Sequence, residues 1–348
     1  MTILNRLTSV SLFAVALVLV VGTGCDKPPE GGPEKAAAAV PPVGKQHDLR
    51  EIAAKVDDVT LTWEEMEHRA KGFYIDESRT TLIPAGREEE AMDFFRRRAI
   101  NVFVFKTIML QEAEKQKITL VAEDYVEGTN RMNRALKSRG IDVERLMRDS
   151  PFGEEMARQE FVDGMIVDKL LKLQVQDRIT VEGAEVDKLA EEIIANRVEQ
   201  RKKANALRQQ LLGGADFATL AAANSDDASK KNGGDLGQFA RGRMIKPFDE
   251  AAFSQAVGAI GPVVETPFGF HIIKVTSHNP AQAAGKDTPE VPETVQASHI
   301  LIKARPVLTR RELMDEVRRT KYNEAVKAYY AGLKRGRKID SVYKDLVL

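Results

Sequence analysis

Two histidines and one aspartate are the side chains of this sequence whose chemistry could support a reaction. His271 and His299 each lie in a β-rich stretch, HIIKV and HILIK, in which side chains alternate between the two faces of a strand. If the two strands are adjacent and antiparallel, the imidazoles can share a hydrogen bond, with one nitrogen donating and one accepting when both rings are neutral. Asp227, taken by itself, is an aspartate of a polar loop.

Other chemistries have less support. The two histidines and Asp227 could bind a metal ion, but no third ligand lies at a spacing typical of zinc, so we expect neither a metal nor another cofactor. A buried histidine pair that only orders a sheet is an open alternative, and it is compatible with catalysis because the pair would still shape a site. Ser225 lies in no G-x-S-x-G nucleophile elbow. His47, His68 and His278 have no partner in the pattern.

Apolar side chains accompany these polar ones between Asp227 and His271. By spacing alone, Leu236, Met244 and Phe248 indicate an ordinary hydrophobic core, which nearby Phe239 would join. The whole stretch 216–277 contains a helical run, a polar turn-rich segment, a second amphipathic piece and two β-rich stretches. This order predicts a small module that combines helices with a sheet.

The module resembles the parvulin family of peptidyl-prolyl isomerases. The matching segments are Phe217–Leu220, Ser225–Asp227, Gly234–Gly237, Phe239–Met244, Lys246–Phe248 and Phe268–Val275. So dense a match excludes coincidence as an explanation.

One element of the family is missing from its usual place. Parvulins begin with a strand of the type A-S/R-H-I-L-I/V-K, whereas here 186–212 has a helical pattern. The missing strand comes later, as VQASHILIK at 295–303. In the parvulin fold this strand lies antiparallel beside the last one, and an antiparallel pair needs no crossover helix. We therefore expect a circularly permuted module. Two alternatives are a strand exchanged between two molecules and the remnant of a lost second parvulin domain.

The resemblance implies rotation about X-Pro bonds as the reaction. Uncatalysed rotation has a barrier of about 20 kcal/mol and takes tens of seconds. No bond is made or broken, so the catalyst must bind the twisted amide more tightly than the planar one.

The resemblance also implies the roles of individual residues. Leu236, Met244 and Phe248, with Phe239, would bind the proline ring. Asp227 would face the substrate carbonyl. His271 and His299 correspond to the paired histidines of the family, and Thr266 to the hydroxyl that joins their network. Phosphate specificity is not implied, because the permutation changes the course of the basic segment after the relocated strand.

The N-terminal residues have the pattern of an export signal. An apolar run of 15 residues, Leu7–Val21, precedes Gly22-Thr23-Gly24-Cys25, and it is shorter than the roughly 20 residues of a spanning helix. Cys25, the only cysteine, resembles the lipidated residue of a bacterial lipoprotein box. The alternative is an uncleaved anchor with an incidental thiol. We predict a signal peptide at 1–25 and a Pro/Gly/Ala-rich tether at 26–47.

The remaining segments predict helices. Thr62 and Glu65 form a capping box, and helical patterns cover 88–116, 122–137, 142–148, 151–176 and 181–212. This part, 48–212, resembles the chaperone domain of extracytoplasmic parvulin proteins. We expect the parvulin module to occupy 213–304, and a C-terminal helix within 305–348 to return to the helical domain.

The expected fold class is therefore α+β. A parvulin (FKBP-like) four-stranded antiparallel sheet with helices would be inserted in a mainly α-helical domain. The charge is balanced, with 52 basic and 52 acidic residues among 348, so no nucleic-acid partner is expected. The predicted function is a lipid-anchored foldase, on the extracytoplasmic side of a membrane, that isomerises X-Pro bonds in unfolded exported polypeptides. The alternative is a chaperone of the same polypeptides with an inactive module.

Overall fold

The chain forms two compact units. A computed structural model describes residues 48–78, 83, 86–137, 142–150, 153–283 and 291–343. One unit comprises Met1–Thr180 together with Arg319–Leu348, and the other comprises Val181–Arg318. The second unit is thus inserted between two parts of the first. We call them the helical unit and the sheet unit.

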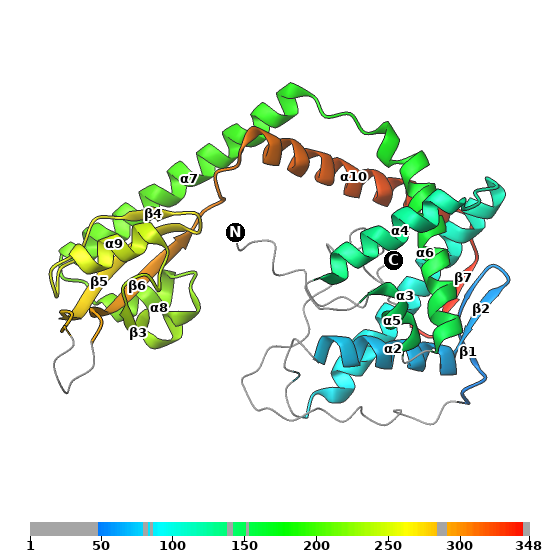
Figure 1. Ribbon diagram of the computed structural model, residues 1–348, viewed down its shortest axis with the longest axis horizontal. Coiled ribbons are helices and arrows are strands. Elements are labelled where there is room, and N and C mark those ends of the chain that lie inside the picture. Colours follow the sequence, from blue (N-terminus) through cyan, green and yellow to red (C-terminus); the bar gives the residue numbers. More distant parts are fainter. Residues whose placement is uncertain are drawn as a thin grey trace. The chain divides into compact units, whose positions relative to one another are not determined.

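The sheet unit is built on four antiparallel strands in the order β3-β6-β5-β4 (Figure 1). The bounds are Asp235–Ala240 for β3, Val264–Thr266 for β4, Gly269–Asn279 for β5 and Thr294–Lys303 for β6. The strand β6 pairs with β3 on one side and with β5 on the other, within its own chain. The expected sheet and the relocated strand are confirmed, and neither an exchanged strand nor a domain remnant is needed.

Helices cover both faces of this sheet. On one face, α7 (Gly183–Leu212) and α8 (Phe217–Asn224) bury the even-numbered side chains of the central strands. On the other face, α9 (Lys246–Ser254) buries the odd-numbered ones. The paired parts Gly269–Val275 of β5 and His299–Ile302 of β6 are largely buried on both faces, as expected for strands with a helix layer on each side.

The division of the chain differs from the expected boundary at residue 212. The C-terminal half of α7 contributes Ala204, Leu207 and Leu211 to the core of the sheet unit. Its N-terminal half packs through Val186 and Ile193 on the start of α10 (Arg310–Lys334), still within that unit. Helical periodicity reveals an apolar stripe but not its partner, which is why the sequence joined α7 to the preceding helices.

Glycines lie at the ends of two helices. The left-handed residue after α7 is Gly214, with φ of 94°, whereas Gly213 has φ of −78°. The helix α6 (Glu154–Gln174) begins after Gly153. The predicted range of 151–176 therefore began too early for this helix.

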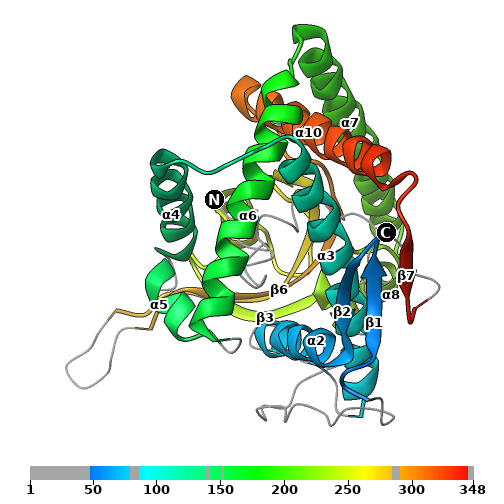
Figure 2. The ribbon, with the colours of Figure 1, turned by 90° about the vertical axis from the view of Figure 1, so that its right-hand side faces the viewer.

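The helical unit contains α2 to α6 and a small sheet of order β2-β1-β7, in which β7 lies beside β1 (Figure 2). The helices not yet given are α2 (Trp63–Ser78), α3 (Glu88–Lys115), α4 (Ala122–Leu136) and α5 (Val143–Arg148). The strands are β1 (Ile52–Val56), β2 (Val59–Thr62) and β7 (Ile339–Ser341). Sequence analysis did not foresee β7, because three residues carry too little pattern.

The predicted capping box at the start of α2 is confirmed. The Thr62 hydroxyl accepts a hydrogen bond from the Glu65 amide, and the Glu65 carboxylate accepts one from the Thr62 amide. At the other end of the chain, Val326 of α10 packs with Phe105 and Leu170 in a core of the helical unit.

The expected signal peptide, Cys25 and the tether lie outside the described residues. Within the described ranges, no helix is both long enough and apolar enough to cross a lipid bilayer.

Candidate active site

The two predicted histidines meet at the centre of the sheet. Strand β5 pairs with β6 so that His271 is opposite Leu301 and His299 is opposite Ile273, which makes the histidines diagonal neighbours on one face. Their rings stack with centroids 5.4 Å apart, and the two Nδ1 atoms are 3.2 Å apart. Both side chains are buried. The expected hydrogen bond between the imidazoles is confirmed.

Thr266 extends this pair on the side of β4. Its Oγ1 is 2.8 Å from Nε2 of His271, and it also accepts the amide of Phe268 at 3.1 Å. On the other side, Nε2 of His299 is 3.3 Å from a carboxylate oxygen of Asp227. The structure therefore brings together all four predicted polar residues. They form a row in the order Thr266, His271, His299, Asp227, which we call the histidine row.

One distribution of protons suits the whole row. If the Thr266 hydroxyl donates to Nε2 of His271, then Nδ1–H of His271 donates to Nδ1 of His299, and Nε2–H of His299 points to Asp227. The opposite order would place a lone pair of His299 against the carboxylate. The contact with Asp227 does not meet hydrogen-bond geometry, so Nε2 of His299 has no hydrogen-bond partner among the described residues.

Burial determines the charge of the row. Burial and, to a lesser degree, the neighbouring His299 lower the pKa of His271 to about 3, against the opposing effect of Asp227. Burial also lowers the pKa of His299, again against the effect of Asp227. Burial acts to raise the pKa of Asp227, but hydrogen bonding with Ser229 and the nearby His299 imidazole outweigh it and hold that pKa at about 2. At neutral pH two uncharged imidazoles therefore face one carboxylate.

Asp227 is held in place by the two residues before it. The buried Ser225 hydroxyl accepts the amides of Leu301 at 3.1 Å and of Asp227 at 3.3 Å. The amide of Asp226 donates to the carbonyl of Leu301, and its carboxylate accepts the amide of Lys303. Sequence analysis missed the role of Ser225, which orients the loop along β6.

Gly234 brings the turn after Asp227 against β6. It has φ of 84°, and a Cβ built there would lie 2.4 Å from the carbonyl oxygen of His299. The amide of His299 in turn donates to the carbonyl of Gly234 at 2.9 Å. Only glycine combines this backbone conformation with so close an approach.

The four predicted apolar residues take different places beside the imidazoles. Phe248 is buried, and its ring lies edge-on to both histidines, with centroids 5.3 Å from His271 and 5.6 Å from His299. Leu236 and Met244 are only partly buried and pack on the same cluster, so they keep accessible apolar surface. Phe239 is buried behind Phe248, with ring centroids 6.4 Å apart.

A second polar cluster fixes the entry to β6. Glu293 accepts hydrogen bonds from Arg241 at 2.7 Å, and its other carboxylate oxygen is 2.8 Å from Nε2 of His278. The Arg241 guanidinium lies 4.3 Å from the ring centroid of Phe253, a neighbour of Phe239. The sequence offered no signal for this cluster, because its members are far apart along the chain.

The arrangement can bind and polarise, and it offers no activated nucleophile. Among the described residues, no group of three or more histidine, cysteine, aspartate or glutamate side chains is placed to hold a metal ion. What the site presents is partly exposed apolar surface, two neutral imidazoles and one oriented carboxylate. Such a surface suits a ligand that is apolar on one side and carries a carbonyl group.

Comparison with known proteins finds one matching domain family. Residues 169–279 match the family described as "PPIC-type PPIASE domain". This range ends before β6, although β6 lies within the same sheet. In the usual parvulin order this strand comes first, so a match to that order does not reach β6 at the end of the domain.

Three relatives illustrate the similarity. The chain is 32% identical over 193 residues to "Foldase protein PrsA" of Caldanaerobacter subterraneus subsp. tengcongensis, covering 53% of this chain and 57% of that protein. It is 54% identical over 71 residues to "Peptidyl-prolyl cis-trans isomerase Pin1" of Digitalis lanata, covering 20% and 60%. It is 25% identical over 284 residues to "Chaperone SurA" of Cupriavidus metallidurans, covering 74% and 56%. The chain thus spans somewhat more than half the length of these relatives.

Proposed function

We propose, from the PPIC-type (parvulin) domain that residues 169–279 carry, that this protein is a peptidyl-prolyl cis-trans isomerase and a foldase for exported polypeptides. The observation that carries the proposal is the row Thr266–His271–His299–Asp227 beside Phe248, with partly exposed apolar side chains next to it.

The proposed mechanism needs no covalent step. Leu236, Met244 and Phe248 bind the proline ring and remove it from water. A planar amide has negative charge on its oxygen and positive charge on its nitrogen, so a carboxylate beside the carbonyl disfavours the planar form. Asp227 therefore favours the twisted amide, whose carbonyl is less polarised. Each 1.4 kcal/mol taken from the barrier of about 20 kcal/mol increases the rate about tenfold.

The histidines have an orienting role in this mechanism. They are neutral at physiological pH, and His299 faces the carboxylate with an N–H group. This N–H faces Asp227 and favours its ionised form without neutralising its charge, while the Ser229 amide fixes the carboxylate by a hydrogen bond. The row also keeps water away from the inner side of the bound proline.

The test is isomerase activity on short Ala-Xaa-Pro-Phe peptides, measured by protease coupling or NMR exchange. We expect the purified full-length protein to be active, and Met244→Ala and Asp227→Ala to lose activity at least tenfold while their circular dichroism is unchanged. Glu250→Ala is the control, because Glu250 lies on α9 but only faces exposed Lys246 at 3.8 Å. A folded parent without activity would contradict the proposal.

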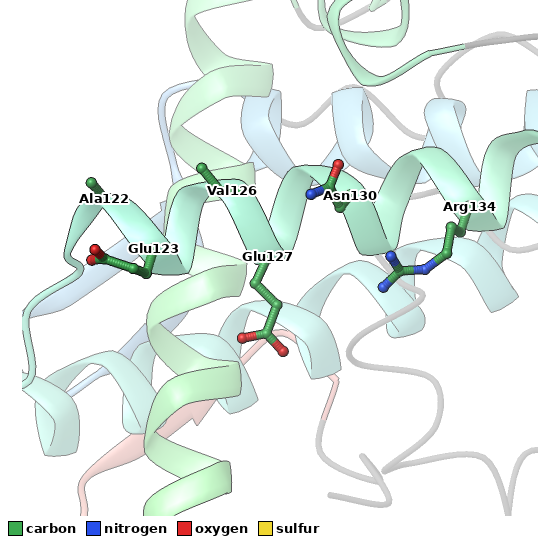
Figure 3. Close-up of a pocket in the computed structure, with 6 residues that line it drawn as sticks. All are labelled: Ala122, Glu123, Val126, Glu127, Asn130 and Arg134. Carbon is green, nitrogen blue, oxygen red and sulfur yellow. The ribbon is translucent and has the colours of Figure 1, made fainter.

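That outcome would favour the second candidate, a chaperone that binds extended chains. The helix α4 supports it, because Val121 at its N-terminal end and Tyr125 and Val126 on the helix are exposed apolar side chains. Figure 3 shows the outer side of this helix, where Val126 lies between Glu123 and Asn130. Suppression of aggregation of an unfolded protein, retained by Asp227→Ala and lost by Val126→Asp, would show polypeptide binding independent of isomerisation.

The proposed location is the extracytoplasmic side of a membrane, with acyl chains on Cys25. The supporting observation is the apolar run followed by Gly22-Thr23-Gly24-Cys25, since several acyl chains anchor a protein stably where one is marginal. Mass spectrometry of the protein from membranes should find a lipidated Cys25 at the mature N-terminus. In Cys25→Ser the protein should not be lipidated, and a lipid-modified Cys25→Ser protein would contradict the proposal.

A further inference from the structure

A buried arginine of α7 connects the edge strand β4 to the segment that follows the central strand β6. Arg197 is only 8% exposed. Its Nη2 forms an ion pair with Glu265 of β4, and its Nη1 donates to the carbonyl of Arg305, just after β6, at 2.7 Å. The guanidinium also lies 5.1 Å from the ring centroid of Phe270. The side chain of the neighbouring Asn196 accepts a hydrogen bond from the amide of Arg305 at 3.0 Å, so α7 binds both the backbone amide and the backbone carbonyl of Arg305.

Strand β4 needs such support. It has three residues, lies at the edge of the sheet and pairs with β5 alone. Its last residue is Thr266, whose hydroxyl bonds to His271. Its middle residue is Glu265, the partner of Arg197. A displacement of this short strand would therefore separate the hydroxyl from the imidazole.

Arg197 acts from the face of the sheet opposite the site. Its neighbour Phe270 belongs to the core under α7 and α8, together with Ile302. His271, the next residue of β5, points to the other face, where Phe248 lies. Arg197 therefore cannot contact a substrate bound beside Met244, and any effect on the reaction must pass through the strands.

We propose that Arg197 is a positioning residue for the site. It holds β4 and the end of β6 so that Thr266 bonds to His271 and His271 to His299. The inference rests on the proposed isomerase function and deepens it, because it makes α7 part of the catalytic unit. The smallest active piece would then begin near Val181, and not at Gly213 after the helix.

The kinetic test uses Arg197→Met, which keeps the apolar stem and removes the guanidinium. We expect a fall of about tenfold in kcat with KM unchanged, the lower end of the ten- to hundredfold that is typical of partners that orient metal-binding residues. Arg197→Lys keeps a cation for Glu265 and should recover part of the loss. The control is Arg201→Met, one turn further along α7, where an exposed arginine lies 4.0 Å from the same Glu265.

Three kinetic results would overturn the proposal. They are a kcat of Arg197→Met within twofold of the parent, an equal loss in Arg201→Met, and a change confined to KM. Thermal unfolding is measured first, and each variant must have its unfolding midpoint well above the assay temperature, so that it is folded in the assay.

A spectroscopic test separates this inference from the isomerase proposal. The chain has five histidines, so selective ¹⁵N labelling resolves the tautomer of His271. In the parent we expect an unprotonated Nε2, and in Arg197→Met an exchange between both tautomers. The same His271 spectrum in both proteins would overturn the positioning role. If the parent is inactive but the tautomers differ, the isomerase proposal fails and the positioning role stands.

Discussion

The two units differ in how they bury polar side chains. The sheet unit buries two neutral histidines, and its buried Arg197 pairs with the more exposed Glu265, whereas the helical unit buries both partners of an ion pair, in which Arg96 donates to Glu67 at 2.5 Å. A second nitrogen of Arg96 donates to the more exposed Glu89 at 2.6 Å. The nearby ring of Phe95 packs edge-on against buried Tyr74, 6.1 Å away.

The difference shows which buried polar groups serve a site. The histidine row ends at Asp227, whose side chain is 34% exposed, beside apolar surface that a ligand can reach. The ion pair of Arg96 and Glu67 joins α3 to α2. This contrast favours our proposal that the row of the sheet unit serves a ligand, whereas the ion pair connects two helices.

The largest expected effect concerns the sheet unit and comes from the loss of its central strand β6. Deletion of 296–303 removes most of β6, the strand between β3 and β5. The loss of its buried side chains exceeds the roughly 5–15 kcal/mol by which a domain is stable. We expect hydrogen exchange to show an unprotected sheet unit while the amides of α3 remain protected. Unchanged thermal unfolding of the shortened protein would disprove the central place of β6.

The next largest effect is expected when the buried ion pair of the helical unit is broken. Arg96→Met leaves the Glu67 carboxylate buried without its partner, which should cost the helical unit about 3–5 kcal/mol. Isomerase activity should stay unchanged. Arg87→Met is the control, because Arg87 forms an ion pair with Glu90 in which both side chains are exposed, so its loss should be below about 1 kcal/mol. Urea unfolding measures both, and equal losses would contradict the difference in burial.

Substitution of two glycines by alanine tests how closely the turn after Asp227 approaches His299. Gly234→Ala should cost about 3 kcal/mol, through its positive φ and the contact with the His299 carbonyl. Gly237→Ala has φ of 68° but free space around its Cβ, so only the backbone cost of about 1–2 kcal/mol remains. The difference between the two free energies of unfolding isolates the crowding at His299. Equal costs would mean that the loop yields without disturbing β6.

The neutral histidines predict a pH dependence. Below about pH 6.5 the unfolded chain protonates His271, whereas the folded chain does so only near its pKa of about 3. The folded state therefore loses about 1.4 kcal/mol of stability per pH unit as the pH falls through this range, for this histidine alone. Asp227 adds a further loss between about pH 4 and its pKa of about 2. Urea unfolding at several pH values should show a shallower slope for His271→Gln, and an unchanged slope would contradict the buried neutral pair.

Sequence reasoning reached the site because its residues belong to dense local motifs. His271 and His299 lie in strands whose alternation is plain, and VQASHILIK is recognisable as a displaced strand through its resemblance to the first strand of parvulins. The antiparallel pairing with β5 then followed from the family arrangement, and the structure bears it out.

The supporting contacts could not be predicted in the same way. Arg197 and Glu265 are 68 residues apart, and Arg241 and Glu293 are 52 apart. Each is an ordinary charged residue in its own segment, and only the folded backbone shows that Arg197 is buried. The domain boundary was misplaced for a related reason, since the apolar stripe of α7 does not reveal which core it joins.

The place of β6 directly after β5 also has a consequence for how the sheet unit folds. With the strand in its usual first position, the central pair of the sheet would join the two ends of the domain. Here the same pair, from Gly269 opposite Lys303 to Asn279 opposite Thr294, joins consecutive strands of the chain. Local contacts lower contact order and speed folding. We expect this pair to form early, as a hairpin on which β3 and α7 then assemble.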